Sequence, residues 1–295
     1  MLNTLKKFEC VEYDRPMSRY TSYRTGGNAD ILCTPKSVSE LVEILKILKT
    51  ESVPVYVFGN CSNVLVRDKG IRGAVILTTG LKGINVNTTQ ITCEAGVSLS
   101  RLANTAMNSG LTGAEPISGI PGSVGGAISM NAGSYGTEMK DIVISAAYLD
   151  EDLNIRKKNS IELCFGNRRS CFTGTDDIVL SAIFSFKPGI KEEIRMRMSE
   201  YASKRKENQP LEYPSCGSVF KRPEGYFSGK LIQDAGLKGY TVNGACVSEK
   251  HAGFIINKGN ATSDDILKVI DFVKLTVYNK FKVILETEVK IFGEE

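Results

Sequence analysis

The sequence predicts an α+β protein built from more than one domain. The chain has 295 residues, and a length well above roughly 150 residues favours two or three domains. A helix and strands alternate near the N-terminus, short strands separated by turns dominate the middle, and helical patterns return towards the C-terminus. This segregation of strands and helices is typical of α+β folds.

Residues 1–80 form the first predicted domain. Apolar residues recur at helical spacing over 38–48, directly after Ser37, which is a suitable N-cap. Apolar runs at 53–58 and 73–77 predict two strands. The first domain therefore starts as a small layer of one helix on strands.

Residues 81–207 form the second predicted domain. Short strands are expected at 84–86 and 90–94, followed by a helix over 99–108 that Gly110 closes. The later elements are a meander of strands over 142–186, interrupted by a turn at 150–154, and a charged helix over 191–206 that ends before Pro210.

Residues 208–284 form the third predicted domain. A loop over 213–226 leads to a short helix opened by Ser228, and a long helix over 264–280 is expected to be capped by Ser263. The chain ends on a predicted strand at 285–291, and residues 285–295 are expected to return to the first domain.

Composition excludes several classes of function. Lys and Arg number 37 against 33 Asp and Glu, a net charge of +4 with no basic face, so nucleic-acid binding is not expected. The eight cysteines include no CxxC pair, which favours reduced thiols in the cytoplasm. His251 is the single histidine, so no multi-histidine metal site can form. No leader and no apolar run of about 18 residues are present, and we expect no membrane association.

Two turn-rich segments are candidate ligand sites. Five glycines lie between Gly113 and Gly126, so the backbone there has little side-chain cover and can approach a phosphate. A tight structural turn is an equally good explanation, because no known phosphate-loop spacing is present. The turn at 59–63 follows a strand, where ligands of α/β proteins often bind, but an ordinary strand-end turn also explains it.

Other polar residues have plain structural explanations when each is considered alone. Arg168 and Arg169 are neighbours, and in an extended segment alternation would turn one of them inward. Ser218 follows a glycine in a turn before a predicted strand, and alternation in the last strand places Glu286 and Glu288 on one exposed face. Nothing in the sequence brings Cys61 or Cys216 next to His251 as a thiolate–imidazole pair.

Seven segments in order resemble the UDP-N-acetylenolpyruvoylglucosamine reductases of bacterial cell-wall synthesis, in the shorter branch of that family. The segments are YRTGGNAD at 23–30, GNCSNVLV at 59–66, GIPGSVGGA at 119–127 with NAG at 131–133, GSVFK at 217–221, GLKG at 236–239, HAGFIIN at 251–257 and LETEV at 285–289. This chain has Cys61 at a usual glycine and Asn167 at a usual tyrosine. The resemblance covers most of the chain.

The resemblance implies a flavin-binding half of two subdomains, of the vanillyl-alcohol-oxidase or PCMH-like type, and a smaller C-terminal α+β substrate domain. It implies non-covalent FAD, NADPH as co-substrate, a sugar nucleotide as substrate, no metal and a monomer. The implied cofactor-binding residues are Phe58, Gly59, Asn60, Cys61, Ser62, Asn63, Val64, Ser118, Gly119, Ile120, Pro121, Gly122, Ser123, Gly125, Gly126, Ala127 and Asn131.

The resemblance also implies three catalytic residues. Reduced flavin would deliver hydride to an enolpyruvyl ether, and Arg168 would stabilise the enolate that forms. Ser218 would protonate that enolate, while Glu288 would orient the substrate, a water or the donor. Contacts to the uridine diphosphate are implied for Arg222, Tyr226, Lys230 and His251.

Two other functions are open at this point. A flavin oxidase on the same scaffold would use oxygen and could tether its flavin through Cys61. A catalytically silent nucleotide-binding module is the other, and the Arg168, Ser218 and Glu288 set argues against it.

Overall fold

The computed structural model describes residues 2–295 and divides into two compact units. Unit 1 takes the chain up to Tyr13, residues 31–60 and residues 73–204. Unit 2 takes residues 14–30, 61–72 and 205–295. Each unit is therefore assembled from three separate stretches of chain.

A four-stranded sheet with one helix forms the N-terminal layer. Its strand order is β1 (Val11–Pro16), β2 (Asn28–Cys33), β5 (Ile71–Leu77) and β3 (Val55–Phe58), with β3 parallel to β5. Helix α1 (Val38–Thr50) begins at Ser37, whose hydroxyl accepts a hydrogen bond from the Glu40 N–H at 3.2 Å. Leu41, Ile44 and Leu48 of α1 are fully buried with Ile76 of β5, so the periodic apolar face predicted for this helix is the one it buries.

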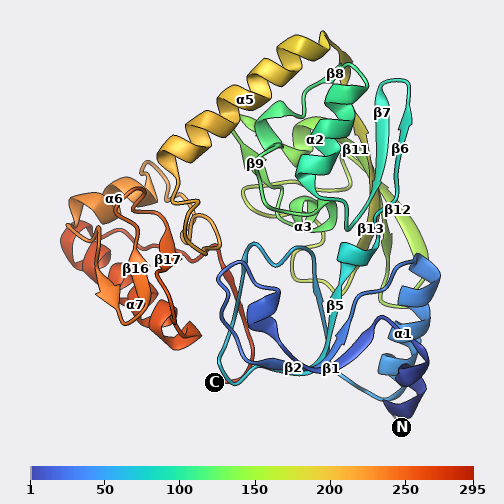
Figure 1. Cartoon of the computed structure of the whole chain (residues 1–295), viewed down its shortest axis with the longest axis horizontal. Coiled ribbons are helices and arrows are strands. Elements are labelled where there is room, and N and C mark those ends of the chain that lie inside the picture. The colour runs from blue at the N-terminus through green and yellow to red at the C-terminus, as the bar shows by residue number, and fades with distance from the viewer. Residues whose placement is uncertain (1) are drawn as a thin grey trace. The chain divides into compact units, whose positions relative to one another are not determined.

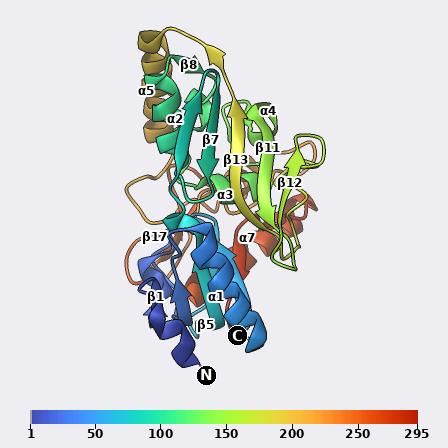
Figure 2. The ribbon, with the colours of Figure 1, turned by 90° about the vertical axis from the view of Figure 1, so that its right-hand side faces the viewer.

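A five-stranded antiparallel sheet forms the rest of the core of unit 1 (Figure 2). Its order is β12 (Ile155–Asn159), β11 (Val143–Leu149), β13 (Ile178–Ser185), β7 (Gln90–Glu94) and β6 (Ile84–Asn87). Helices α2 (Leu99–Asn108) and α3 (Val124–Ser129) bury their apolar residues against this sheet in one cluster. The predicted helix at 99–108 is confirmed.

Short elements connect these layers. They are η1 (Leu2–Lys7), η2 (Met17–Arg19), η3 (Thr78–Gly80), β8 (Leu111–Thr112), η4 (Glu115–Ile117), β9 (Gly133–Ser134), β10 (Thr137–Glu138), α4 (Met139–Ile142) and β14 (Lys187–Pro188). Helix α5 (Lys191–Asn208) follows as one long, charged helix that fully buries only Ile194 (Figure 1).

Unit 2 holds a small α+β core. Strands β15 (Thr241–Val242), β16 (Ala245–Val247) and β17 (Ile255–Asn257) form an antiparallel sheet, and helices α6 (Ser228–Asp234) and α7 (Ser263–Phe281) belong to the same apolar cluster. Strand β18 (Lys290–Phe292), near the C-terminus, pairs in parallel with β4 (Val64–Val66).

Two local predictions were wrong. The N-cap of α7 is Thr262, not Ser263, because the Thr262 hydroxyl and the Asp265 carboxylate form a reciprocal capping box. Helix α6 does start at Ser228, as predicted, and Phe227 at its N-cap position gives no side-chain bond. The last strand covers only 290–292, since residue Thr287 pairs singly with Phe220.

Candidate active site

In unit 1, the turn after β3 packs against the glycine-rich loop. The Asn60 amide donates a hydrogen bond to the Pro121 carbonyl at 2.8 Å. At Gly59, an added Cβ would lie only 2.2 Å from the Ser123 Oγ, so a side chain there would displace that hydroxyl. The structure therefore brings Gly59 and Asn60 of the first predicted flavin segment into contact with Pro121 and Ser123 of the second.

The Ser123 hydroxyl is a candidate ligand contact. Ser123 is 2% exposed, and its Oγ has no hydrogen-bond partner in the part of the chain that the structure describes. Leaving such a group unpaired costs about 1–3 kcal/mol, which a ligand oxygen would offset. At Gly126, an added Cβ would meet only the Ser123 Oγ, at 3.8 Å, so the backbone is open on this side.

Gly125, on the same helix, has a different role. An added Cβ would lie 3.0 Å from the Ala95 Cβ, and the N–H groups of Val124 and Gly125 donate to the Val97 and Ala95 carbonyls, both at 2.9 Å. These two N–H groups bond to main-chain carbonyls of the protein and so are not available to a ligand. Close packing explains Gly59, against the Ser123 hydroxyl, and Gly125, against Ala95, whereas Gly126 alone of the three glycines leaves open space for a ligand.

A cavity of about 820 Å³ opens beside Asn60 in unit 1. This volume lies in the range of small-molecule and cofactor sites. Three cationic residues and one acidic residue line it among small and polar ones: Lys36, Lys82, Arg101, Glu12, Cys10, Thr34, Thr79, Gly80, Gly96, Val97 and Ser98. Positive charge at an open cavity fits an anionic ligand such as a dinucleotide.

Arg168 lies in a tight turn, not on a strand. The Gly166 N–H donates to the Arg169 carbonyl at 2.9 Å, the Arg169 N–H returns a bond at 3.3 Å, and Arg168 has φ +54°. The predicted alternation therefore does not apply, because the chain reverses between Gly166 and Arg169, with Arg168 inside the turn. Arg168 is still the more buried of the two, since Arg169 is exposed.

Asn131 holds the Arg168 turn. Its side chain is fully buried, and its amide donates to the Gly166 carbonyl and to the Glu138 carboxylate, both at 3.0 Å. Its own oxygen accepts from the Lys140 N–H at 3.1 Å. Glu138 was missed from the sequence, and the only local signal for it is its capping position three residues before Asp141.

In unit 2, two predicted residues, Ser218 and His251, come together around Gly253. Ser218 pairs with Phe254 in an isolated antiparallel bridge, and the Val219 N–H donates to the Gly253 carbonyl at 2.9 Å. An added Cβ at Gly253 would lie 3.0 Å from both the Ser218 Oγ and the His251 Cε1. The hydroxyl and the imidazole therefore approach the same glycine.

Glu288 joins this group through the main chain. Its N–H donates to the Val219 carbonyl at 2.7 Å, next to Ser218. The predicted exposed face was wrong, because Glu286 alone is exposed, in an ion pair with Lys221 at 2.8 Å, while Glu288 is half-buried. Two-residue alternation fails here since residues 285–289 are not a regular strand.

The residues implied for the diphosphate lie around the start of α6. Arg222 donates through Nε to the Tyr226 carbonyl at 3.2 Å, and its guanidinium lies 3.8 Å from the ring centre of Phe227. Lys230 is exposed and pairs with Asp234. Phe227, 61% exposed, was missed from the sequence, and its ring carries the Arg222 guanidinium on one face.

His251 is half-buried in this part of unit 2. Burial lowers the pKa of the imidazole below its ordinary value, and nearby Lys238 lowers it further. Its Nδ1 accepts a hydrogen bond from the Gly253 N–H at 3.2 Å. The ring is therefore neutral at pH 7 and can donate through Nε2.

The buried thiols do not suit nucleophilic chemistry. Burial raises the pKa of Cys61 to about 12, and it raises the pKa of Cys216 still further. The Cys216 thiol donates to the Val64 carbonyl at 3.3 Å. A reactive thiolate at either residue is not supported.

Comparison with known proteins identifies the family. Residues 29–157 match an FAD binding domain, and residues 209–292 match the C-terminal domain of UDP-N-acetylenolpyruvoylglucosamine reductase. The UDP-N-acetylenolpyruvoylglucosamine reductase of Caldanaerobacter subterraneus subsp. tengcongensis is 50% identical over 282 residues, covering 96% of this chain and 93% of its own. The chain belongs to the UDP-N-acetylenolpyruvoylglucosamine reductase family. The reductase from Thermus caldophilus has a crystal structure that matches with a TM-score of 0.82 and 34% identity, over 96% of this chain and 99% of that chain.

A more distant structure is similar in fold alone. A variant of berberine bridge enzyme, a reticuline dehydrogenase, matches 64% of this chain and 43% of its own with a TM-score of 0.51 and 15% identity. The predicted α+β fold with a vanillyl-alcohol-oxidase or PCMH-like flavin half is confirmed. As a member of the reductase family, the chain is an FAD-dependent oxidoreductase of peptidoglycan precursor synthesis.

Two absences hold over residues 2–295. No group of three or more His, Cys, Asp or Glu side chains there could hold a metal ion. No helix in that range has the length and apolar character needed to cross a membrane.

Proposed function

We propose that this reductase uses NADPH to convert the enolpyruvyl ether of UDP-N-acetylglucosamine enolpyruvate to UDP-N-acetylmuramate, with Arg168, Ser218 and Glu288 as catalytic residues. One hydride and one proton are added across the carbon–carbon double bond. The observation that carries the proposal is the grouping of Ser218, His251 and Glu288 in unit 2, each at a position that matches a family motif.

FAD is proposed to bind non-covalently at the glycine-rich loop and the cavity of unit 1. The unpaired Ser123 hydroxyl, the open side of Gly126 and the cationic cavity beside Asn60 support this. The loop residues 58–64 and 118–127, with Asn131, would hold it. When bound, FAD supplies the hydride that NADPH provides. The buried, protonated thiol of Cys61 disfavours a tether at that residue, and so the oxidase alternative.

Arg168 is proposed to stabilise the enolate. Its guanidinium keeps its charge and can hold a carboxylate by two hydrogen bonds. A turn fixed by Asn131 would keep that charge in place before the reaction starts, which is what electrostatic stabilisation of a developing anion requires.

Ser218 is proposed to donate the proton. A serine hydroxyl is a weak acid, but an enolate carbon is strongly basic, and a neutral donor places no second negative charge beside the substrate. Glu288 is bound through its own N–H to Val219, next to Ser218, so its half-buried carboxyl group can orient the donor or a water.

The nucleotide end of the substrate is proposed to meet Arg222, Tyr226, Lys230 and His251. Arg222 and Lys230 are exposed cations near the start of α6, and an added Cβ at Gly229 would lie 3.5 Å from His251. A neutral His251 would donate a hydrogen bond to a phosphate oxygen. We also propose that the enzyme works as a monomer in the cytoplasm.

A comparison of the two arginines tests the proposal. Arg168→Ala should slow reoxidation of reduced enzyme by the enolpyruvyl substrate about 10²- to 10³-fold, while reduction by NADPH stays near the parent rate. Arg169→Ala is the matched control and should matter less. If the two variants exchange these effects in stopped-flow measurements, the assignment of Arg168 is wrong.

A further inference from the structure

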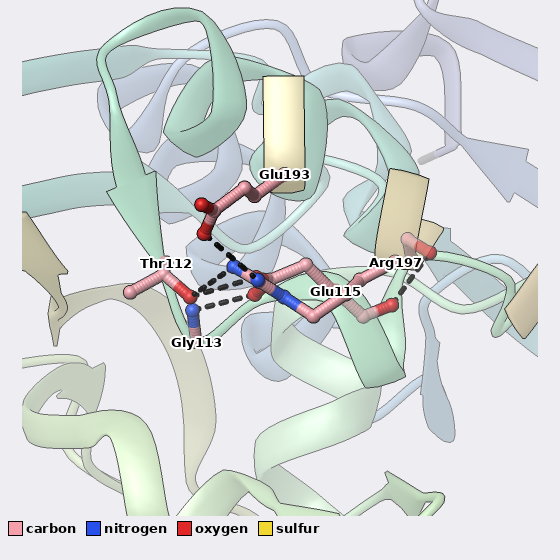
Figure 3. A network of polar contacts seen from close by, with 6 residues as sticks. Thr112, Gly113, Glu115, Glu193 and Arg197 are labelled. Atoms are coloured by element: carbon pink, nitrogen blue, oxygen red, sulfur yellow. Dashed lines mark hydrogen bonds and ion pairs between the residues drawn. The ribbon is translucent and has the colours of Figure 1, made fainter. Parts of the chain in front are cut away.

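Glu115 is a buried carboxylate that the proposed reaction does not use. It is 3% exposed and precedes the glycine-rich loop by three residues. The Thr112 hydroxyl donates to its Oε1 at 2.7 Å, and the Gly113 N–H donates to its Oε2 (Figure 3). These hydrogen bonds satisfy the buried carboxylate and hold its side chain in one position.

Arg197 of α5 completes the network. Its Nε and Nη2 both donate to the Glu115 Oε1, at 3.0 and 2.9 Å, and Nη2 also donates to the Thr112 hydroxyl at 3.1 Å. Glu193, one turn earlier, is 53% exposed and lies 3.7 Å from Arg197. Glu115 is therefore the strong partner of this arginine, and Glu193 is the weak one.

The charge of Glu115 is stable in this setting. Burial alone would raise its pKa, but hydrogen bonds from Thr112, Gly113 and Arg197 outweigh burial and hold the pKa below the ordinary value. Glu115 therefore stays ionised across neutral pH, and the Glu115–Arg197 pair is charged on both sides.

The main-chain carbonyl of Glu115 binds Ser118, the first residue of the 118–127 loop. Its carbonyl accepts the Ser118 N–H at 3.2 Å and the Ser118 hydroxyl at 2.7 Å. Two residues after Ser118 comes Ile120, whose N–H donates to the Ile117 carbonyl, and Pro121 then receives the Asn60 amide. The side chain and the main chain of Glu115 thus join α5 to the segment that meets the turn at Asn60.

We infer that Glu115, held by Arg197, is a positioning residue that fixes the first residues of the 118–127 loop in the shape that binds FAD. The inference rests on the proposed role of that loop. Glu115 would act through the loop and not by a contact of its own with FAD. A loop that is already ordered loses less conformational entropy when it binds a ligand, so loosening its anchor weakens binding without removing a contact.

FAD titration of the deflavinated enzyme tests this, with flavin fluorescence as readout. Glu115→Gln and Arg197→Met should each raise the FAD dissociation constant about tenfold, while kcat at saturating FAD changes less than about twofold. The double variant should resemble one single variant, because both remove the same interaction. Glu193→Gln is the matched control and should bind FAD like the parent.

Three outcomes separate the possibilities. If Glu115→Gln and Arg197→Met lower only the melting temperature and bind FAD like the parent, the pair is structural and the inference is overturned. Gly126→Val should weaken FAD binding directly. If it does so while Glu115→Gln and Arg197→Met have no effect on FAD binding, the 118–127 loop binds FAD but Glu115 does not position it. If Gly126→Val also binds FAD normally, the proposed loop is wrong.

A milder variant covers the case in which Glu115→Gln fails to fold. Arg197→Lys keeps the charge, but an ammonium cannot reproduce the paired Nε and Nη2 bonds. Buried Ile194 keeps α5 packed. We expect an intermediate rise in the FAD dissociation constant, about threefold, and an unchanged value would overturn the inference.

Discussion

The side-chain amide of Asn63 donates a hydrogen bond to the main-chain carbonyl of Glu288 at 3.1 Å. The Asn63 carbonyl in turn accepts the Lys290 N–H at 3.0 Å, so Asn63 binds the main chain at Glu288 and again two residues later. Asn63→Ala should lower the free energy of unfolding by about 1–3 kcal/mol and slow reoxidation by the enolpyruvyl substrate, because Glu288 loses its anchor.

Asn28→Ala is the control for this prediction. Asn28 also donates a side-chain hydrogen bond in unit 2, to Asp14 at 2.8 Å, but it does not contact the Glu288 segment. Urea unfolding and stopped-flow traces would be compared for the two variants. Equal reoxidation rates would show that Asn63 has no role in placing Glu288.

Ser218→Ala should slow only the second half of the reaction. Removing a general acid typically costs about 10²- to 10⁴-fold in rate, and reduction by NADPH involves no proton transfer to a substrate carbon. Ser218→Cys should recover part of the rate, since a thiol is a stronger acid of similar size. Ser215→Ala, in the same loop, is the control. If the Ser218→Ala variant is reoxidised at the parent rate, Ser218 is not the proton donor, and Glu288 or a water donates the proton instead.

The thiols should differ strongly in alkylation rate. Burial raises the pKa of Cys61 and of Cys93 to about 12, so at pH 8 only about one thiol in 10⁴ is ionised. Cys164 is exposed and should react with iodoacetamide first. Mass spectrometry of the labelled peptides checks the order of reaction. Rapid labelling of Cys61 would contradict the argument against a covalent flavin attachment at that residue.

Tyr135 sits in a strained turn whose relief should be measurable. Tyr135 and Gly136 join β9 to β10 with φ +49° and +85°, as in a type I′ turn, where asparagine is favoured and tyrosine is rare. Its ring also stacks on Tyr201, with 4.8 Å between ring centres. In a Tyr201→Ala background, which removes that stack, Tyr135→Asn should raise the free energy of unfolding by about 1 kcal/mol. A decrease in urea unfolding experiments would contradict the turn assignment.

Local patterns were enough to predict several regular elements. The helix at 99–108, closed by Gly110, and the strand at 90–94 were predicted with the bounds that the structure has, and the strand predicted at 73–77 covers 71–77. The last strand failed because Leu285 and Val289 are buried by packing in unit 2 and not by two-residue alternation. Sequence patterns also missed that residues 61–72 belong to unit 2, since that grouping depends on long-range pairing of β4 with β18.

The candidate active-site residues were predicted from family motifs and not from local hydrophobic or turn patterns. Asn131 contacts Gly166 across 35 residues, and Asn63 contacts Glu288 across 225. No periodicity reveals contacts at such separations. Glu115 and Arg197, 82 residues apart, carry no catalytic motif, so only the structure could bring them to attention.

The absorbance spectrum of the purified enzyme under anaerobic conditions tests the central claim most directly. The protein should be yellow from non-covalent FAD that is released by acid, NADPH should bleach it, and UDP-N-acetylglucosamine enolpyruvate should then restore the colour with one equivalent of UDP-N-acetylmuramate formed. If the bleached enzyme regains its colour only with oxygen and not with the enolpyruvyl substrate, the proposed reaction is wrong.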